Sequence, residues 1–109
     1  MHYFIEGEIA SMEENKIVAL ENLHKSLKLY PTSPTIYNAI GDVYENQNDY
    51  PNALENYILA YDLNQDDALG FKIFSLYKEI GEIDKANDFL DQLLIIHPQN
   101  SQLLYEKAQ

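Results

Sequence analysis

Histidine and acidic side chains are the residues of this chain that could bind a metal ion. The three histidines, His2, His24 and His97, are far apart in the sequence, and no cysteine accompanies them, so metal-ligand spacing is lacking. The segment NQDDALG resembles the start of a calcium loop, but Ala68 occupies a ligand position and Ser75 replaces the bidentate glutamate. The sequence therefore predicts no metal site and no cofactor.

Motifs for catalysis are missing in the same way. The four glycines, Gly7, Gly41, Gly70 and Gly81, are isolated, so no phosphate loop, dinucleotide fingerprint or nucleophile elbow is formed. The 18 acidic residues are spread along the chain, which is typical of a solvated acidic face rather than of an acid/base pair. We expect that the chain is not an enzyme.

The charge balance excludes further classes of partner. With 18 acidic and 7 basic residues the formal net charge is -11, which disfavours nucleic acids and anionic membrane surfaces. The longest aliphatic run, Leu93 to Ile96, is far shorter than the roughly 20 residues of a membrane span. The first residues lack the basic and apolar regions of a signal peptide, and cysteine is absent, which favours a cytoplasmic location.

The elements that would position any functional residue come from an internal repeat of about 34 residues. A small set of residues defines it in the middle of the chain: Tyr37, Gly41, Tyr44, Ala53, Tyr57 and Ala60. One repeat length before members of that set lie Tyr3, Gly7, Ala19, Leu23 and Ser26. Downstream the spacing is one residue shorter, since Ala53 and Tyr57 are followed by Ala86 and Leu90. One residue has therefore been lost before Ala86.

Each repeat unit is expected to form two helices. Ser33 as N-cap and Pro34 at the first helical position start a helix that ends near Asn46, and Pro51 starts the next one. The third unit repeats this arrangement, with Gly81 between its helices. In the first unit residues 13–16 are predicted to form the turn, and a second helix is marked by Val18, Leu20, Leu23, Leu27 and Leu29. Small residues at the helix contacts, Gly41, Ala53 and Ala60, would let the helix axes approach closely.

This pattern resembles the tetratricopeptide repeat (TPR) family. The segment PTIYNAIGDVYENQNDYPNALENYILAYDLN matches its aromatic, Gly, Tyr, Ala and aromatic places, and GEIDKANDFLDQLLIIHP matches the second half of a unit. The resemblance implies an all-α fold: a right-handed superhelical stack of antiparallel helix hairpins, or α-solenoid. It implies one domain over 1–109, with repeats at about 1–33, 34–67 and 68–100 and a capping or truncated helix over 101–109.

In this family the first helix of each unit lines a concave groove that binds peptides. The matching positions are Phe4, Glu8, Ser11 and Met12 in the first unit, and Thr35, Asn38, Asp42, Glu45 and Asn46 in the second. In the third unit they depend on the lost residue. A loss between units selects Phe71, Lys72, Ser75, Lys78 and Glu79, whereas a loss in the turn between helices selects Leu69, Lys72, Leu76 and Glu79.

The groove positions also indicate the kind of partner. Some members of the family bind acidic tails with a lysine and asparagine clamp, but Phe4, Glu8 and Ala39 stand at its places here. The carboxylates instead favour a basic or amphipathic peptide or helix of a partner protein. The leading interpretation is a non-catalytic protein-protein interaction module. The alternatives are a structural or regulatory segment of a larger enzyme, sensor or assembly, and self-association through the open repeat ends, including Leu103, Leu104 and Tyr105.

Overall fold

The helices of the chain form a thin, elongated stack. The computed structural model describes the backbone of residues 2–109 and the side chains of residues 15–109. The molecule measures 52 × 36 × 20 Å, and its radius of gyration is 16.6 Å. A compact domain of this length would have a radius of gyration of about 13 Å. The chain therefore exposes far more helix surface than a globular domain, as a repeat array does.

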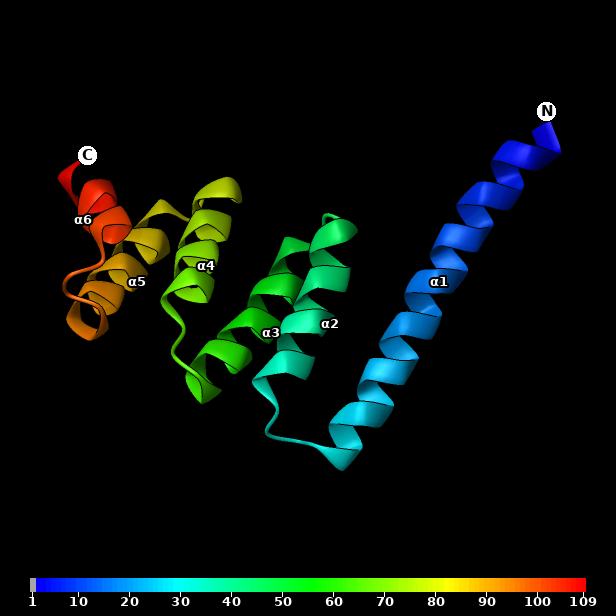
Figure 1. Ribbon diagram of the computed structural model, residues 1–109. Coiled ribbons are helices and arrows are strands. Elements are labelled where there is room, and N and C mark those ends of the chain that lie inside the picture. Colours follow the sequence, from blue (N-terminus) through cyan, green and yellow to red (C-terminus); the bar gives the residue numbers. More distant parts are fainter. Residues whose placement is uncertain (1) are drawn as a thin grey trace.

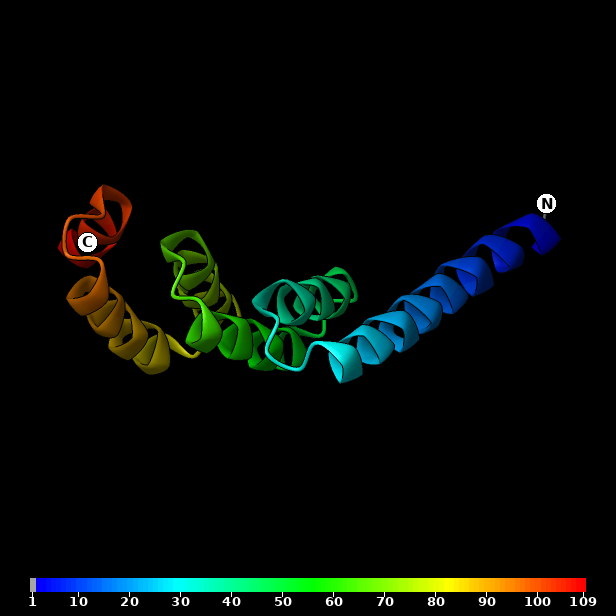
Figure 2. The same ribbon diagram turned by 60° about the horizontal axis from the view of Figure 1, so that its bottom comes forward.

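Six helices occupy the described part of the chain, and each packs against the next (Figure 1). Their bounds are α1 His2–Leu29, α2 Pro34–Asn46, α3 Tyr50–Leu63, α4 Asp67–Glu79, α5 Ile83–Ile96 and α6 Ser101–Ala108. Figure 2 shows α2, α4 and α6 in one layer, on the inside of the curve, with α3 and α5 in the other layer. The predicted all-α stack of antiparallel helices is confirmed.

Polar side chains start four of these helices. Ser33, Asp49, Asp66 and Asn100 each accept a hydrogen bond from a backbone N–H in the first turn of the helix that follows. The two turns inside the hairpins α2/α3 and α4/α5 share one more feature, a residue with positive φ: Asn48 at 60° and Gly81 at 83°. Asparagine and glycine are the residues that adopt this conformation most readily.

The first unit lacks such a turn, and the expected break at residues 13–16 is wrong. Helix α1 runs without interruption from His2 to Leu29, so the first unit is one long helix instead of a hairpin. The repeat explains the difference. Glu14 lies one repeat length before Asn48, and Ile17 lies one repeat length before Pro51. Glutamate does not favour positive φ, and residues 13–16 contain neither glycine nor proline to end a helix.

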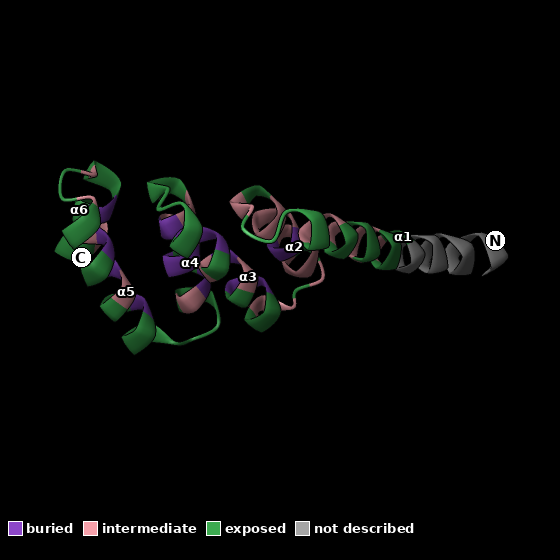
Figure 3. Cartoon of the chain, turned by 90° about the horizontal axis from the view of Figure 1, so that it is seen from below, coloured by how far each residue is buried: buried purple, intermediate pink, exposed green. Residues whose placement is uncertain are grey.

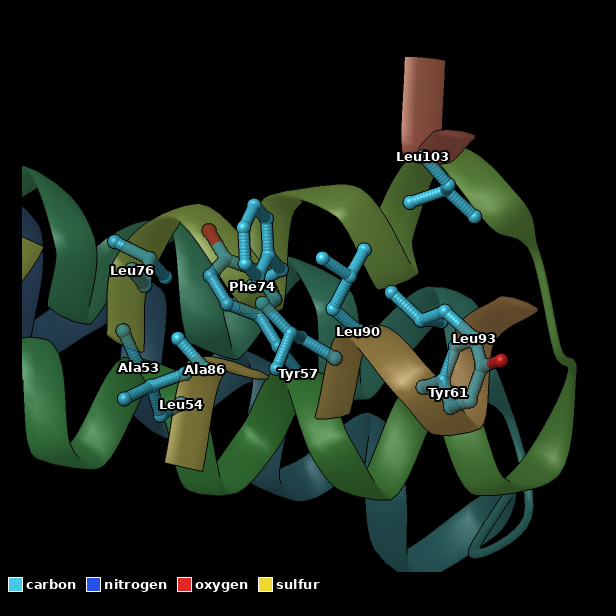
Figure 4. Close-up of a cluster of buried hydrophobic side chains, with 11 residues drawn as sticks. Ala53, Leu54, Tyr57, Tyr61, Phe74, Leu76, Ala86, Leu90, Leu93 and Leu103 are labelled. Atoms are coloured by element: carbon cyan, nitrogen blue, oxygen red, sulfur yellow. The ribbon is translucent and has the colours of Figure 1, made fainter. Parts of the chain in front are cut away.

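The buried core lies between α3, α4 and α5 and reaches α6. Figure 4 shows most of this cluster, which consists of Ala53, Leu54, Tyr57, Tyr61, Ile73, Phe74, Leu76, Ala86, Leu90, Leu93 and Leu103. The small residues have the predicted packing role. Ala53 and Ala60 are fully buried, and a Cβ added to Gly41 would lie 2.6 Å from Cε1 of Tyr57.

The helix bounds also locate the residue that the repeat has lost. Helices α2 and α4 begin at Pro34 and Asp67, and α3 and α5 begin at Tyr50 and Ile83, so the shorter spacing is already present at the start of α4. The connection before α4 has three residues, 64–66, whereas those before α2 and α6 have four, 30–33 and 97–100. The loss therefore lies between the second and third units, in the α3–α4 connection. Phe74 consequently occupies the place of Gly41.

Candidate functional site

The candidate site is the inner surface of the stack, on the layer formed by α2, α4 and α6 (Figure 2). We define this inner surface by the predicted positions Asn38, Asp42, Glu45 and Asn46 on α2 and Phe71, Lys72 and Ser75 on α4. All seven are half-buried or exposed. The remaining four predicted positions, Phe4, Glu8, Ser11 and Met12, belong to α1, and their side chains lie outside the described residues.

The α3–α4 connection decides between the two predicted registers of the third unit. With the residue lost between units, the positions on α4 are Phe71, Lys72, Ser75, Lys78 and Glu79. The other register required Leu76 to face the groove, but Leu76 is buried in the core. Phe71 is half-buried and packs beside Phe74, with ring centroids 6.0 Å apart.

Lys72 joins two carboxylates of α2 on this surface. Its Nζ lies 3.1 Å from Oδ1 of Asp42 and 3.3 Å from Oε1 of Glu45, and all three side chains are partly exposed. The same ammonium group lies 4.6 Å from the centroid of the Tyr57 ring, so a cation–π contact accompanies the ion pairs. Two carboxylates thus share one lysine across the α2–α4 contact.

Tyr57 is a further member of this site, which the sequence analysis names only as a position of the repeat. Its ring is buried, but its hydroxyl lies 2.5 Å from Oδ1 of Asp42 and 2.6 Å from Oε1 of Glu45. A phenol has one hydrogen, so the two carboxylates share this donor. The signal that could have revealed it is the spacing of Asp42 and Glu45, which are three residues apart, on one face of α2, next to Gly41.

The surroundings shift the pKa values of two of these groups. Burial, together with the hydrogen bonds to Asp42 and Glu45, raises the pKa of Tyr57 far above its usual range. Partial burial by itself would lower the pKa of Lys72, but the hydrogen bond to Asp42 and the charges of both carboxylates outweigh it and raise that pKa. Both groups therefore keep their protons at neutral pH, and the cluster carries a net negative charge when both carboxylates are ionised.

Other charges of this layer are also paired. Lys78 of α4 lies 3.6 Å from Glu106 of α6, and Lys107 of α6 lies 2.6 Å from Asp91 of α5. Helices α2, α4 and α6 together contain five carboxylates and three lysines. The inner layer is therefore acidic, but less so than the sequence suggested, because its lysines already bind part of its carboxylates.

A small hollow adjoins the inner surface between the N-terminal ends of α2 and α4. Its volume is about 150 Å³. Residues of α2, α3, α4 and the α3–α4 connection line it: Pro34, Thr35, Asn38, Ala60, Asn64, Asp66 and Leu69. A volume of this size accommodates one side chain of a bound peptide, and its lining combines apolar groups with amide and carboxylate oxygens.

Neither a metal centre nor a membrane span is present in the part of the chain that the structure describes. Between residues 15 and 109, histidine and acidic side chains do not come together in groups of three or more that could hold an ion. None of the described helices is both long and apolar enough to cross a bilayer. His97 is the C-cap residue of α5, and its Nε2 lies 3.4 Å from the Tyr61 hydroxyl.

Comparison with known proteins identifies the repeat. The chain is 31% identical over 93 residues to the TPR repeat-containing protein MJ1428 of Methanocaldococcus jannaschii, and the match covers 84% of the chain. The chain belongs to the tetratricopeptide repeat family. The matched segment makes up 16% of that relative, so the chain spans a small part of its length. No family model matches the chain.

The TPR units that are complete in the structure are the hairpins α2/α3 and α4/α5, and α6 adds one further helix. The expectation that Leu103, Leu104 and Tyr105 together expose an apolar surface is partly wrong. Leu103 is fully buried and joins the core, whereas Leu104 and Tyr105 are exposed. Helix α6 therefore covers the last TPR hairpin with the face that carries Leu103. Asn100, the N-cap residue of α6, donates a hydrogen bond to Asp67 and so attaches α6 to α4.

Proposed function

We propose that this TPR chain is a non-catalytic protein-protein interaction module whose inner surface binds a basic or amphipathic segment of a partner protein. Membership of the family supports protein partners in general. The observation that carries the finer proposal is the pair Asp42 and Glu45, which share a single lysine and a single phenol hydrogen. This pair has acceptor capacity left for a further cation.

A basic residue of the partner would approach the carboxylates from solvent, on the side that Lys72 leaves open. The side chains of Asp42 and Glu45 are 48% and 33% exposed, so they remain within reach. A lysine or arginine of the partner would then compete with Lys72 for the same oxygens. The net charge of -11 would increase the association rate, and salt would screen this effect over about 8 Å at physiological ionic strength.

Apolar contacts would come from two neighbouring places. Phe71 offers part of its ring on the inner surface, and the hollow beside Asn38 and Leu69 fits one side chain. An amphipathic segment that carries apolar residues next to a basic one matches this combination of groups. The charged contact would then determine the register, and the apolar contacts would supply most of the affinity.

Peptide binding tests this proposal directly. The probes are an array of amphipathic peptides in which lysine alternates with apolar residues, and a second array with glutamate in place of lysine. We expect the chain to bind the lysine peptides and to release them as salt is added, measured by fluorescence polarisation. Binding of the glutamate peptides, or binding that salt does not affect, would contradict the proposal.

Two variants at the cluster should have opposite effects on the same peptides. Asp42→Asn with Glu45→Gln removes the acceptors of positive charge, so affinity should fall by about fivefold. Lys72→Met removes the internal competitor, so affinity should rise by up to about fivefold. Matched controls on α5, in the other layer, are Asp84→Asn with Asp88→Asn, which removes the same two charges, and Lys85→Met. These controls should change affinity little. Equal effects of cluster and control variants would show that only net charge matters.

A second candidate is a structural or regulatory role inside a larger assembly or enzyme. The length of the relative favours it, since the matched segment is 16% of that protein. The inner surface would then bind a segment of the same polypeptide. Such binding would not weaken on dilution, whereas binding of a separate partner would.

A further inference from the structure

Helix α1 lacks a neighbour that the repeat provides for α3. Ala53, Tyr57 and Ala60 of α3 are fully buried, and α2 and α4 cover them. The residues one repeat earlier, in α1, are Ala19, Leu23 and Ser26, and they are only half-buried. Among residues 15–29 of α1 none is buried, and in Figure 3 this part of the helix carries only the colours of intermediate and exposed residues.

The missing neighbour is the first helix of the first unit. In the second unit that helix is α2, whose Gly41 lies against the ring of Tyr57. The repeat assigns the corresponding place to the N-terminal part of α1, with Gly7 against Leu23. Within one copy this contact does not form, because α1 continues straight through residues 13–16. Along a continuous helix Gly7 and Leu23 are separated by about 24 Å.

We propose that a second copy of this chain supplies the missing helix. Two α1 helices would pair antiparallel about a twofold axis near Asn15, so that residues 2–14 of each copy cover residues 17–29 of the other. This exchange keeps the contact of Gly7 with Leu23 that the repeat prescribes and needs no turn at residues 13–16. It is the geometry of a domain swap, in which a hinge that stays extended directs an element onto the partner copy.

The charges of α1 fit this arrangement. Residues 2–14 contain four glutamates and no lysine, whereas residues 15–29 contain three lysines and one glutamate. Antiparallel pairing places the acidic half of each helix against the basic half of the other, and parallel pairing would place like charges together. In the register of Gly7 against Leu23, Glu14 lies beside Lys16 of the second copy.

Cysteine pairing tests the occupant of this face, because the chain contains no cysteine of its own. One variant carries Gly7→Cys and another carries Leu23→Cys, and the two are mixed and oxidised. We expect a disulfide-linked heterodimer in the mixture, and no such product from either variant alone. Lys28→Cys, mixed with Gly7→Cys in place of Leu23→Cys, is the matched control and should give no link.

The double variant with both cysteines in one chain separates the remaining outcomes. A link formed inside single chains would show that residues 2–14 fold back on their own copy, and the proposal would be overturned. The absence of a link in both experiments would overturn it equally. Mass spectrometry of the oxidised products distinguishes these results.

A charge exchange provides a test that leaves the packed face unchanged. Lys16→Glu, which faces Glu14 of the second copy, should weaken dimerisation by about tenfold, because a twofold interface contains each substitution twice. Adding Glu14→Lys should restore the dimer. Sedimentation equilibrium measures both, and a parent chain that stays monomeric at every concentration would contradict the proposal.

Discussion

Helices α1 and α3 contain equivalent positions of the repeat but have different surroundings. Ala19, Leu23 and Ser26 of α1 correspond to Ala53, Tyr57 and Ala60 of α3 in the repeat, yet only the second set is fully buried. Helix α3 packs between α2 and α4, whereas the described part of α1 packs mainly on α2. In a stack of this kind a position that faces two neighbouring helices is buried only when both are present, so the sequence of one helix does not determine its own burial.

The largest difference between the two helices is expected at the central aromatic position. Tyr57→Ala should lower the free energy of unfolding by about 3–5 kcal/mol, because a fully buried ring leaves a cavity. Leu23→Ala should cost only about 1–2 kcal/mol in the monomer, since Leu23 is half-buried. Urea unfolding of dilute protein measures both values.

The dependence of these two costs on protein concentration tests whether a second copy covers α1. If the second copy covers Leu23, the cost of Leu23→Ala grows as protein concentration rises, while the cost of Tyr57→Ala stays constant. Equal costs for the two substitutions in dilute monomer would show that α1 is as well covered as α3, contrary to the structure.

The repeat made much of the fold predictable, and the reasons are local. The start of α2 at Ser33 and Pro34, the small residues Ala53 and Ala60, and the positive φ of Gly81 each follow from the chemistry of one residue. The turn at residues 13–16 was wrongly predicted because the repeat was extended to a unit that lacks a residue suited to positive φ.

The candidate site was predictable only in part. Asp42, Glu45 and Lys72 were placed on the concave side from the family pattern, but their mutual ion pairs depend on how α4 lies beside α2. That arrangement also decides whether the hydroxyl of Tyr57 reaches solvent-facing carboxylates. The repeat pattern predicts where the ring of Tyr57 packs, but it does not predict which groups the hydroxyl of Tyr57 contacts.

An intermediate effect is expected when the small residue of each helix is enlarged. Ala53→Leu should cost about 1–3 kcal/mol, because the contact of α3 with its neighbours has no room for three further carbon atoms. In dilute monomer Ala19→Leu should change stability by less than about 0.5 kcal/mol, because one side of α1 is then open. Thermal unfolding of the two variants provides the comparison. A loss for Ala19→Leu as large as that for Ala53→Leu would mean that the open side is occupied.

The smallest effect concerns the hydroxyl that α3 has and α1 lacks at this position. Tyr57→Phe should cost about 0.5–1.5 kcal/mol at neutral pH, because Lys72 and water still bind the carboxylates. The folded-state pKa of Tyr57 lies above its ordinary value of 10.0, so the hydroxyl contributes fully below pH 10. Its contribution is lost as the pH rises through the folded-state pKa.

The difference in stability between the parent chain and Tyr57→Phe should therefore shrink as the pH is raised above 10, the ordinary value for this phenol. Lys72 is present in both proteins, and because its pKa is raised, both lose stability as the pH rises above 10.5, the ordinary pKa of lysine. Only the difference in stability between the two proteins therefore reports on Tyr57. Tyr105→Phe, at an exposed position, is the control and should show no difference at either pH. Urea unfolding at pH 8 and again well above pH 10 measures the change. A difference that stays constant would mean that the hydroxyl does not hold α2 and α3 together through Asp42 and Glu45.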